Sequence, residues 1–109
     1  MFYYRKVIPF QRNFYSIITE IELLSYDKLS KEEELKIKNA LGFFKRVNIN
    51  ETIKNITINI RKEKKLKLPD SLIVASAFYK NAVLVTNDKQ LHNLNNLNVI
   101  TLEELKDLN

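Results

Sequence analysis

Short hydrophobic runs alternate along the chain with longer segments whose hydrophobic positions recur at a helical spacing. The aromatic and β-branched run at residues 14–18 predicts a strand, and shorter apolar runs predict further strands at residues 46–49, 83–86 and 99–100. Between these runs, the spacing predicts helices that begin near residues 19, 30, 51, 70 and 101, with a short helical piece at 92–94.

Helix-start signals support these assignments. The pairs Thr19–Glu22, Ser30–Glu33 and Thr101–Glu104 each fit a capping box, in which the first side chain and the carboxylate three residues later satisfy free backbone N–H groups. Asp70 follows Pro69 and fits a helix N-cap. Residues 51–65 also alternate like a strand, but their length and basic end favour a helix, because cations suit a helix C-terminus.

Alternating strands and helices predict a single α/β domain over residues 1–109 with a mainly parallel sheet. Such sheets bind ligands beyond the carboxyl ends of their strands. Glu22 follows the first predicted strand, Asp88 follows the strand at 83–86, and Asp70 heads the helix before that strand. We therefore expect Glu22, Asp70 and Asp88 to share one rim.

Clustered carboxylates repel one another and favour a hard cation such as Mg²⁺ or Mn²⁺. Such ions suit phosphodiester hydrolysis, in which Thr86 could orient a metal-bound water. Each acid also has a purely structural interpretation: Glu22 as a capping-box partner, Asp70 as an N-cap and Asp88 as a turn residue. Both interpretations stay open on position alone.

The amino-acid composition excludes several kinds of functional site. The 109 residues include no cysteine, one glycine and one histidine, which excludes thiolate sites, glycine-rich phosphate loops and multi-histidine sites. No apolar run approaches a membrane span, and we expect a cytoplasmic protein. The net charge of +5 includes a basic segment at 61–67. Two interpretations fit its cations: they contact an RNA backbone, or they interact favourably with the dipole at the end of a helix. These cations are Arg61, Lys62, Lys64, Lys65 and Lys67. His92 is expected to pack rather than bind a ligand.

The segments SIITEIELL and LKLPDSLIVASAFYKNAVLVTND resemble the PIN-domain family, and in particular its VapC-like toxin ribonucleases. The resemblance runs from about residue 14 to residue 100 and implies a three-layer α/β/α fold. It implies that Glu22, Asp70 and Asp88 match acidic metal-binding positions and that Thr86 matches a nearby hydroxyl. It also implies Mg²⁺ or Mn²⁺ as cofactor, an RNA substrate, a cognate antitoxin and a homodimer or higher oligomer.

One feature of the family has no counterpart. Family members begin with a central strand that ends in an acidic residue, whereas no residue before Glu20 is acidic here. Residues 1–12 are interpreted as the tail of a preceding helix, so the domain is expected to lack its N-terminal strand and one metal ligand. Two unpaired central edges would result. We expect a rearrangement that closes the gap, or an oligomer that uses Phe2, Tyr3 and Tyr4.

The leading hypothesis is therefore a metal-dependent endoribonuclease, the toxin of a toxin-antitoxin pair. The first alternative is a catalytically inactive PIN-like protein that acts as a binding or oligomerising module. A second alternative is a small α/β interaction domain in which the three acids serve only as caps and turns.

Overall fold

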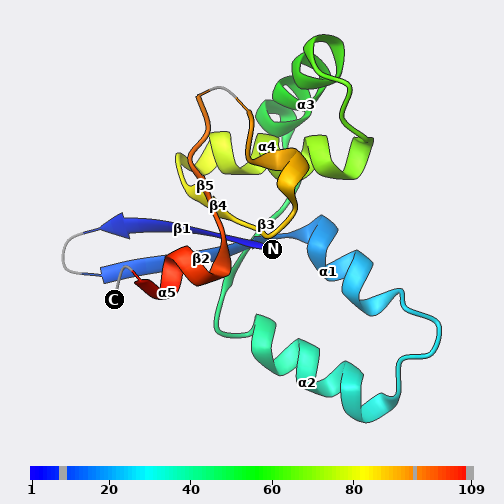
Figure 1. The fold of residues 1–109 in the computed structure, drawn as a ribbon. Helices are drawn as coiled ribbons and strands as arrows, with labels where there is room; N and C mark the ends of the chain where they lie inside the picture. Colours follow the sequence, from blue (N-terminus) through cyan, green and yellow to red (C-terminus); the bar gives the residue numbers. More distant parts are fainter. Residues whose placement is uncertain (8–9, 95, 108–109) are drawn as a thin grey trace.

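The computed structural model describes residues 1–7, 10–94 and 96–107 (Figure 1). In these residues the strands are β1 (Phe2–Val7), β2 (Phe10–Ser16), β3 (Lys45–Val47), β4 (Val83–Val85) and β5 (Val99–Ile100). The helices are α1 (Ile17–Leu24), α2 (Lys31–Leu41), α3 (Glu51–Glu63), α4 (Leu68–Lys80) and α5 (Leu102–Asp107), with a short 3₁₀ helix, η1 (Lys89–Leu91). The α/β class and the helix at 51–65 are confirmed.

The strands form one sheet in the order β3-β2-β1-β4-β5. The pairs β2–β3 and β4–β5 are parallel, whereas β1 runs antiparallel to both of its neighbours. Tyr3 of β1 pairs with Phe14 on one side and with Leu84 on the other. The four strands other than β1 therefore end at the same edge of the sheet, which we call the carboxyl edge.

The N-terminal segment corrects one prediction. Residues 1–12, expected as a helix tail, contain β1 and the start of β2 instead. The physical reason is that strands β2 and β4 would otherwise face each other across a gap with unpaired backbone groups. β1 fills that gap from the chain's own residues, so the gap-closing rearrangement is the alternative that the structure shows.

The hydrophobic core lies between the sheet and helices α3 and α4. Its fully buried side chains include Tyr3, Ile53, Ile73 and Leu84. Small residues on α4 are also buried, and they let this helix approach the sheet closely: Ala75, Ser76 and Ala77. α4 is thus the helix most firmly fixed against the sheet.

Helices α1 and α2 form an arm that stands away from this core (Figure 1). Neither helix contains a buried residue. The predicted capping box Ser30–Glu33 is confirmed at the start of α2, and Thr101–Glu104 forms the same reciprocal pair at α5. Within the described ranges, no helix is both long and apolar enough to span a membrane.

Candidate functional site

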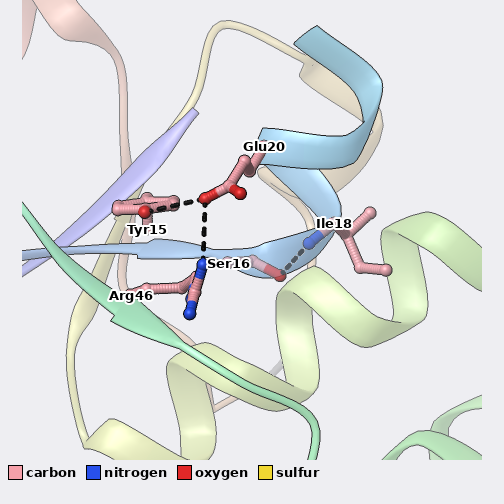
Figure 2. Close-up of polar contacts among 5 residues, drawn as sticks. All are labelled: Tyr15, Ser16, Ile18, Glu20 and Arg46. Atoms are coloured by element: carbon pink, nitrogen blue, oxygen red, sulfur yellow. Dashed lines mark hydrogen bonds and ion pairs between the residues drawn. The ribbon is translucent and has the colours of Figure 1, made fainter. Parts of the chain in front are cut away.

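Helix α1 brings Glu22 to the carboxyl edge. The helix starts directly after β2, and its N-cap is Ser16, whose Oγ accepts a hydrogen bond from the Ile18 N–H at 3.1 Å (Figure 2). Thr19 and Glu22 lie inside the helix, so the predicted capping box between them is wrong. Glu22 is exposed, and among the described residues its carboxylate has no hydrogen bond or ion pair.

The neighbouring carboxylate on α1 has a different role. Glu20 Oε1 accepts a hydrogen bond from the Tyr15 hydroxyl at 2.9 Å and lies 3.5 Å from Arg46 Nη1 (Figure 2). Burial and the adjacent Glu20 carboxylate raise the pKa of Tyr15. Glu20 therefore ties α1 to β2 and β3. Glu22 lies one turn beyond Ile18, which packs against the core, on the side of α1 that faces α4.

Asp70 lies in the first turn of α4, not at its N-cap. The N-cap is Lys67, which makes no side-chain capping bond, and Pro69 falls within the first turn. The predicted capping role of Asp70 is therefore wrong, because the helix begins three residues earlier than expected. The Asp70 carboxylate is half-buried and, in the part of the chain that the structure describes, has no hydrogen bond or ion pair. The positive end of the helix dipole stabilises its charge.

The direction of α4 places Asp70 near the carboxyl edge. The Tyr3 hydroxyl donates a hydrogen bond to the Ile73 carbonyl at 2.6 Å, and Arg5 Nη1 donates to the Lys80 carbonyl at 3.3 Å. α4 therefore runs alongside β1 and in the same direction. Because β1 is antiparallel to the other strands, the first turn of α4 lies toward the edge where those strands end.

The third carboxylate belongs to a tightly bonded loop after β4. The Thr86 hydroxyl accepts from the Asp88 N–H at 3.1 Å, and Asp88 Oδ1 accepts from the Gln90 N–H at 3.0 Å. His92 Nε2 lies 2.7 Å from the Thr86 carbonyl oxygen. The His92 ring thus contacts the backbone of this loop. The turn interpretation of Asp88 is confirmed, and its other carboxylate oxygen remains available.

Sequence reasoning missed two buried hydroxyls near the same edge. Tyr3 fills the centre of the sheet, and its hydroxyl lies beside the Ser16 and Ser76 hydroxyls. Burial raises the Tyr3 pKa far above that of a free tyrosine. Ser16 is fully buried where β2 meets α1. A serine between a strand and a helix is a recognisable N-cap signal, so Ser16 could have been found from the sequence. Tyr3 carried no such signal, because its segment was expected to be helical.

The three predicted acids lie at the ends of α1, α4 and β4, but they do not form one compact cluster. Among the described residues, no group of three histidine, cysteine or acidic side chains is close enough to hold a metal ion. The donor chemistry nevertheless suits a hard divalent cation, because the carboxylates of Glu22 and Asp70 are unneutralised. Ion pairing in the described chain neutralises Glu20 instead.

The basic segment immediately precedes Asp70. Arg61 Nη1 donates a hydrogen bond to the Leu66 carbonyl at 3.1 Å, which bends the chain between α3 and α4. The cations of this segment are exposed, and in the described structure none forms an ion pair: Arg61, Lys62, Lys64, Lys65 and Lys67. Positive charge therefore lies next to one of the unneutralised carboxylates.

Comparisons with known proteins agree with this architecture. A family model described as the PIN domain matches residues 10–97. The chain therefore belongs to the PIN-domain family. The match begins at the first residue of β2, so the antiparallel β1 lies outside it.

Two solved structures are similar to this chain. A chain of a toxin-antitoxin complex from Klebsiella pneumoniae is 32% identical, with a TM-score of 0.67 over 80% of this chain and 71% of that one. A chain of VapBC2 from Rickettsia felis, crystallised with a DNA fragment from its promoter, has a TM-score of 0.72 at 23% identity, covering 81% and 73%. The second likeness shows the fold alone. No curated protein matches the chain.

Proposed function

We propose that this protein is a VapC-like endoribonuclease toxin that hydrolyses RNA with Mg²⁺ or Mn²⁺ at the carboxyl edge. The observation that carries the proposal is the pair of carboxylates, Glu22 and Asp70, that have no partner there among the described residues of a PIN-domain chain. An ion pair or cap would have explained either acid structurally. Their charges instead favour a cation from solution.

Glu22, Asp70 and Asp88 would hold the ion. When bound, such an ion activates water and polarises the phosphoryl oxygens. Asp88 would use the carboxylate oxygen that does not accept from Gln90. The Thr86 hydroxyl accepts from the Asp88 backbone, so its own proton is free to orient a water molecule. The cations of the 61–67 segment would contact the RNA backbone beside Asp70.

The partner that we propose is a cognate antitoxin bound to the arm. Several apolar side chains of the arm are exposed, as expected of a surface that a partner covers: Ile21, Leu23, Tyr26 and Leu35. The likeness to a chain of a toxin-antitoxin complex supports this assignment. We further propose that the protein acts in the cytoplasm as a homodimer or higher oligomer.

The test is cleavage of a mixed RNA pool by the purified protein, with and without Mn²⁺. Asp70→Asn is the matched variant, because it removes the charge and keeps the shape of the side chain. We expect Mn²⁺-dependent cleavage by the parent protein and at least about a hundredfold less by the variant, on the scale of a lost catalytic group. Equal cleavage by both proteins would refute the assignment of Asp70.

A second candidate function is a catalytically inactive binding module. It is favoured by the observation that the described carboxylates form no group of three suited to a metal. Thermal unfolding with Mn²⁺ distinguishes the two functions. The nuclease predicts that Mn²⁺ raises the unfolding temperature of the parent but not of D70N/D88N. The module predicts no cleavage by folded protein and an equally small Mn²⁺ effect on both.

A further inference from the structure

A group of unpaired cations lies at the end of the sheet opposite the carboxyl edge. Arg5 of β1 and Arg12 of β2 are direct partners in the strand register, so their side chains project from the same face. Residues 1–19 contain no acidic residue. Lys80 ends α4 over this face, and Lys45 begins β3 beside β2. In the described part of the chain, none of these four cations forms an ion pair.

Two of these cations lie near the ring of Phe14. The Arg5 guanidinium carbon lies 5.8 Å from the centre of the Phe14 ring, and Lys80 Nζ lies 5.2 Å from the same centre. Arg5 Nε is buried and has no hydrogen-bond partner among the residues that the structure describes. Two cations beside one ring, with no ion pair among the described residues, would be stabilised by an anion bound beside them. The arrangement therefore favours a bound anion.

Exposed aromatic rings flank the cations. A pocket of about 410 Å³ is lined by Arg12, Phe14, Phe43 and Lys45, among others. Phe43 is 87% exposed, more than any other large apolar side chain of the described chain. On α4, Tyr79 is 43% exposed, and Lys80 Nζ lies 5.6 Å from its ring centre. Cations with exposed rings nearby suit the phosphates and bases of a single strand.

We propose that these residues form a second binding surface, for single-stranded RNA. This hairpin surface consists of Arg5, Arg12, Phe43, Lys45, Tyr79 and Lys80. It lies about 13 Å along β2 from Ser16, at about 3.3 Å per residue. It would therefore bind nucleotides that flank the cleaved bond, with Phe43 stacking on a base and Arg12 and Lys45 contacting phosphates. The choice of RNA as the ligand rests on the proposed function.

The experiment measures binding of a fluorescently labelled twelve-nucleotide oligouridylate by anisotropy, over a series of salt concentrations. EDTA is present throughout, so that the result does not depend on cleavage, and failure of the nuclease assignment stays distinguishable from failure of this one. The variants are R12Q/K45Q and F43A, with F43Y as a conservative replacement. K28Q/K31Q is the matched control, because it removes the same charge from exposed, unpaired positions on the arm. Circular dichroism confirms that each variant is folded.

We expect R12Q/K45Q to weaken binding about tenfold and to lower the slope of log K against log salt by about 1.4, at about 0.7 per phosphate contact. F43A should weaken binding at least about fivefold, the lower end for loss of one stacked base, and F43Y should retain it. K28Q/K31Q should change affinity less than about twofold. Equal weakening by both double variants would overturn the proposal, because it would reflect net charge alone. Loss with R12Q/K45Q but not F43A, with equal competition by polyglutamate, would identify an acidic peptide instead.

Discussion

The two helical regions of this molecule differ in how much they contribute to the core. α4 buries six of its residues between the sheet and α3, Ser71 and Ile73 to Ala77, whereas α1 and α2 bury none. α4 and the loop after β4 carry Asp70 and Asp88, and the arm carries Glu22. The candidate site thus joins two acids on the packed part of the molecule to one on its least packed part.

The difference implies that the two regions have different roles. The packed half fixes the fold, because burial of apolar surface is the main favourable term in folding. The arm keeps apolar side chains at the surface, where they stabilise nothing in the isolated chain. A surface of this kind suits an interaction partner. A cation held between Glu22 and Asp70 would also link the arm to the packed half.

The strongest test of this difference in packing is a substitution that creates a cavity in the core of the sheet. Leu84 is completely buried in β4, and Leu84→Ala should lower the free energy of unfolding by about 2–5 kcal/mol. Leu35→Ala on α2, where the side chain is 59% exposed, should change it by less than about 0.5 kcal/mol. Urea unfolding measures both. Similar losses for the two variants would show that the arm contributes to the core after all.

Amide hydrogen exchange tests the same difference in packing between the arm and α4 without a mutation. Local opening needs less free energy where few apolar contacts are broken. We expect the amides of α1 and α2 to be protected at least about a hundredfold less than those in the middle of α4, a difference of about 2.7 kcal/mol. Proposed partner binding should then slow exchange in the arm and leave α4 unchanged. Uniform protection across both regions would contradict the comparison.

A smaller effect is expected from the hydroxyl that joins β1 to α4. Tyr3→Phe removes the hydrogen bond to the Ile73 carbonyl and should cost about 1 kcal/mol at neutral pH. Burial raises the pKa of Tyr3, so the folded state keeps its proton above pH 10, where an unfolded tyrosine loses it. Stability contributed by this group is therefore complete below about pH 10 and falls as pH rises above it, by about 1 kcal/mol at pH 11.

Urea unfolding at pH 7 and pH 11 measures this contribution. Tyr3→Phe should lose less stability than the parent between the two pH values, because phenylalanine has no proton to release. The parent keeps an additional alkaline loss from Tyr15, whose pKa is also raised. An identical pH dependence in parent and variant would mean that Tyr3 is not the buried hydroxyl that links the central strand to α4.

The sequence predicted the parts of the fold that depend on local signals. The helix at 51–65, the apolar strand at 83–85 and the Ser30 capping box follow from periodicity, β-branched residues and cap chemistry. β1 could not be predicted in this way. It pairs with both β2 and β4. Phe2 pairs with Val85, which lies 83 residues away, and local propensity does not report such long-range pairing.

The candidate site shows the same limit at the level of single residues. The positions of Glu22, Asp70 and Asp88 near the ends of α1, α4 and β4 follow from strand order and the parallel-sheet rule. The capping roles of Glu22 and Asp70 were wrong because helix starts are uncertain by several residues in a sequence. The same shift that removed those roles left both carboxylates without partners among the described residues, which strengthens the functional interpretation of each.

The smallest expected effect separates the two carboxylates of α1. Glu20→Gln removes the charge that lies 3.5 Å from Arg46 but keeps an acceptor for Tyr15. Because the pair is partly exposed, its loss should cost only about 0.2–1 kcal/mol, or a few degrees in the unfolding temperature. Glu22→Gln should change nothing in EDTA, since Glu22 has no partner to lose in the described part of the chain, and should abolish the Mn²⁺-dependent rise in unfolding temperature. Thermal unfolding of both variants in EDTA and in Mn²⁺ measures this. If Glu20→Gln abolished the Mn²⁺ effect and Glu22→Gln did not, the metal would belong with the carboxylate that faces β3, and the arm would bind its ion on the side away from α4.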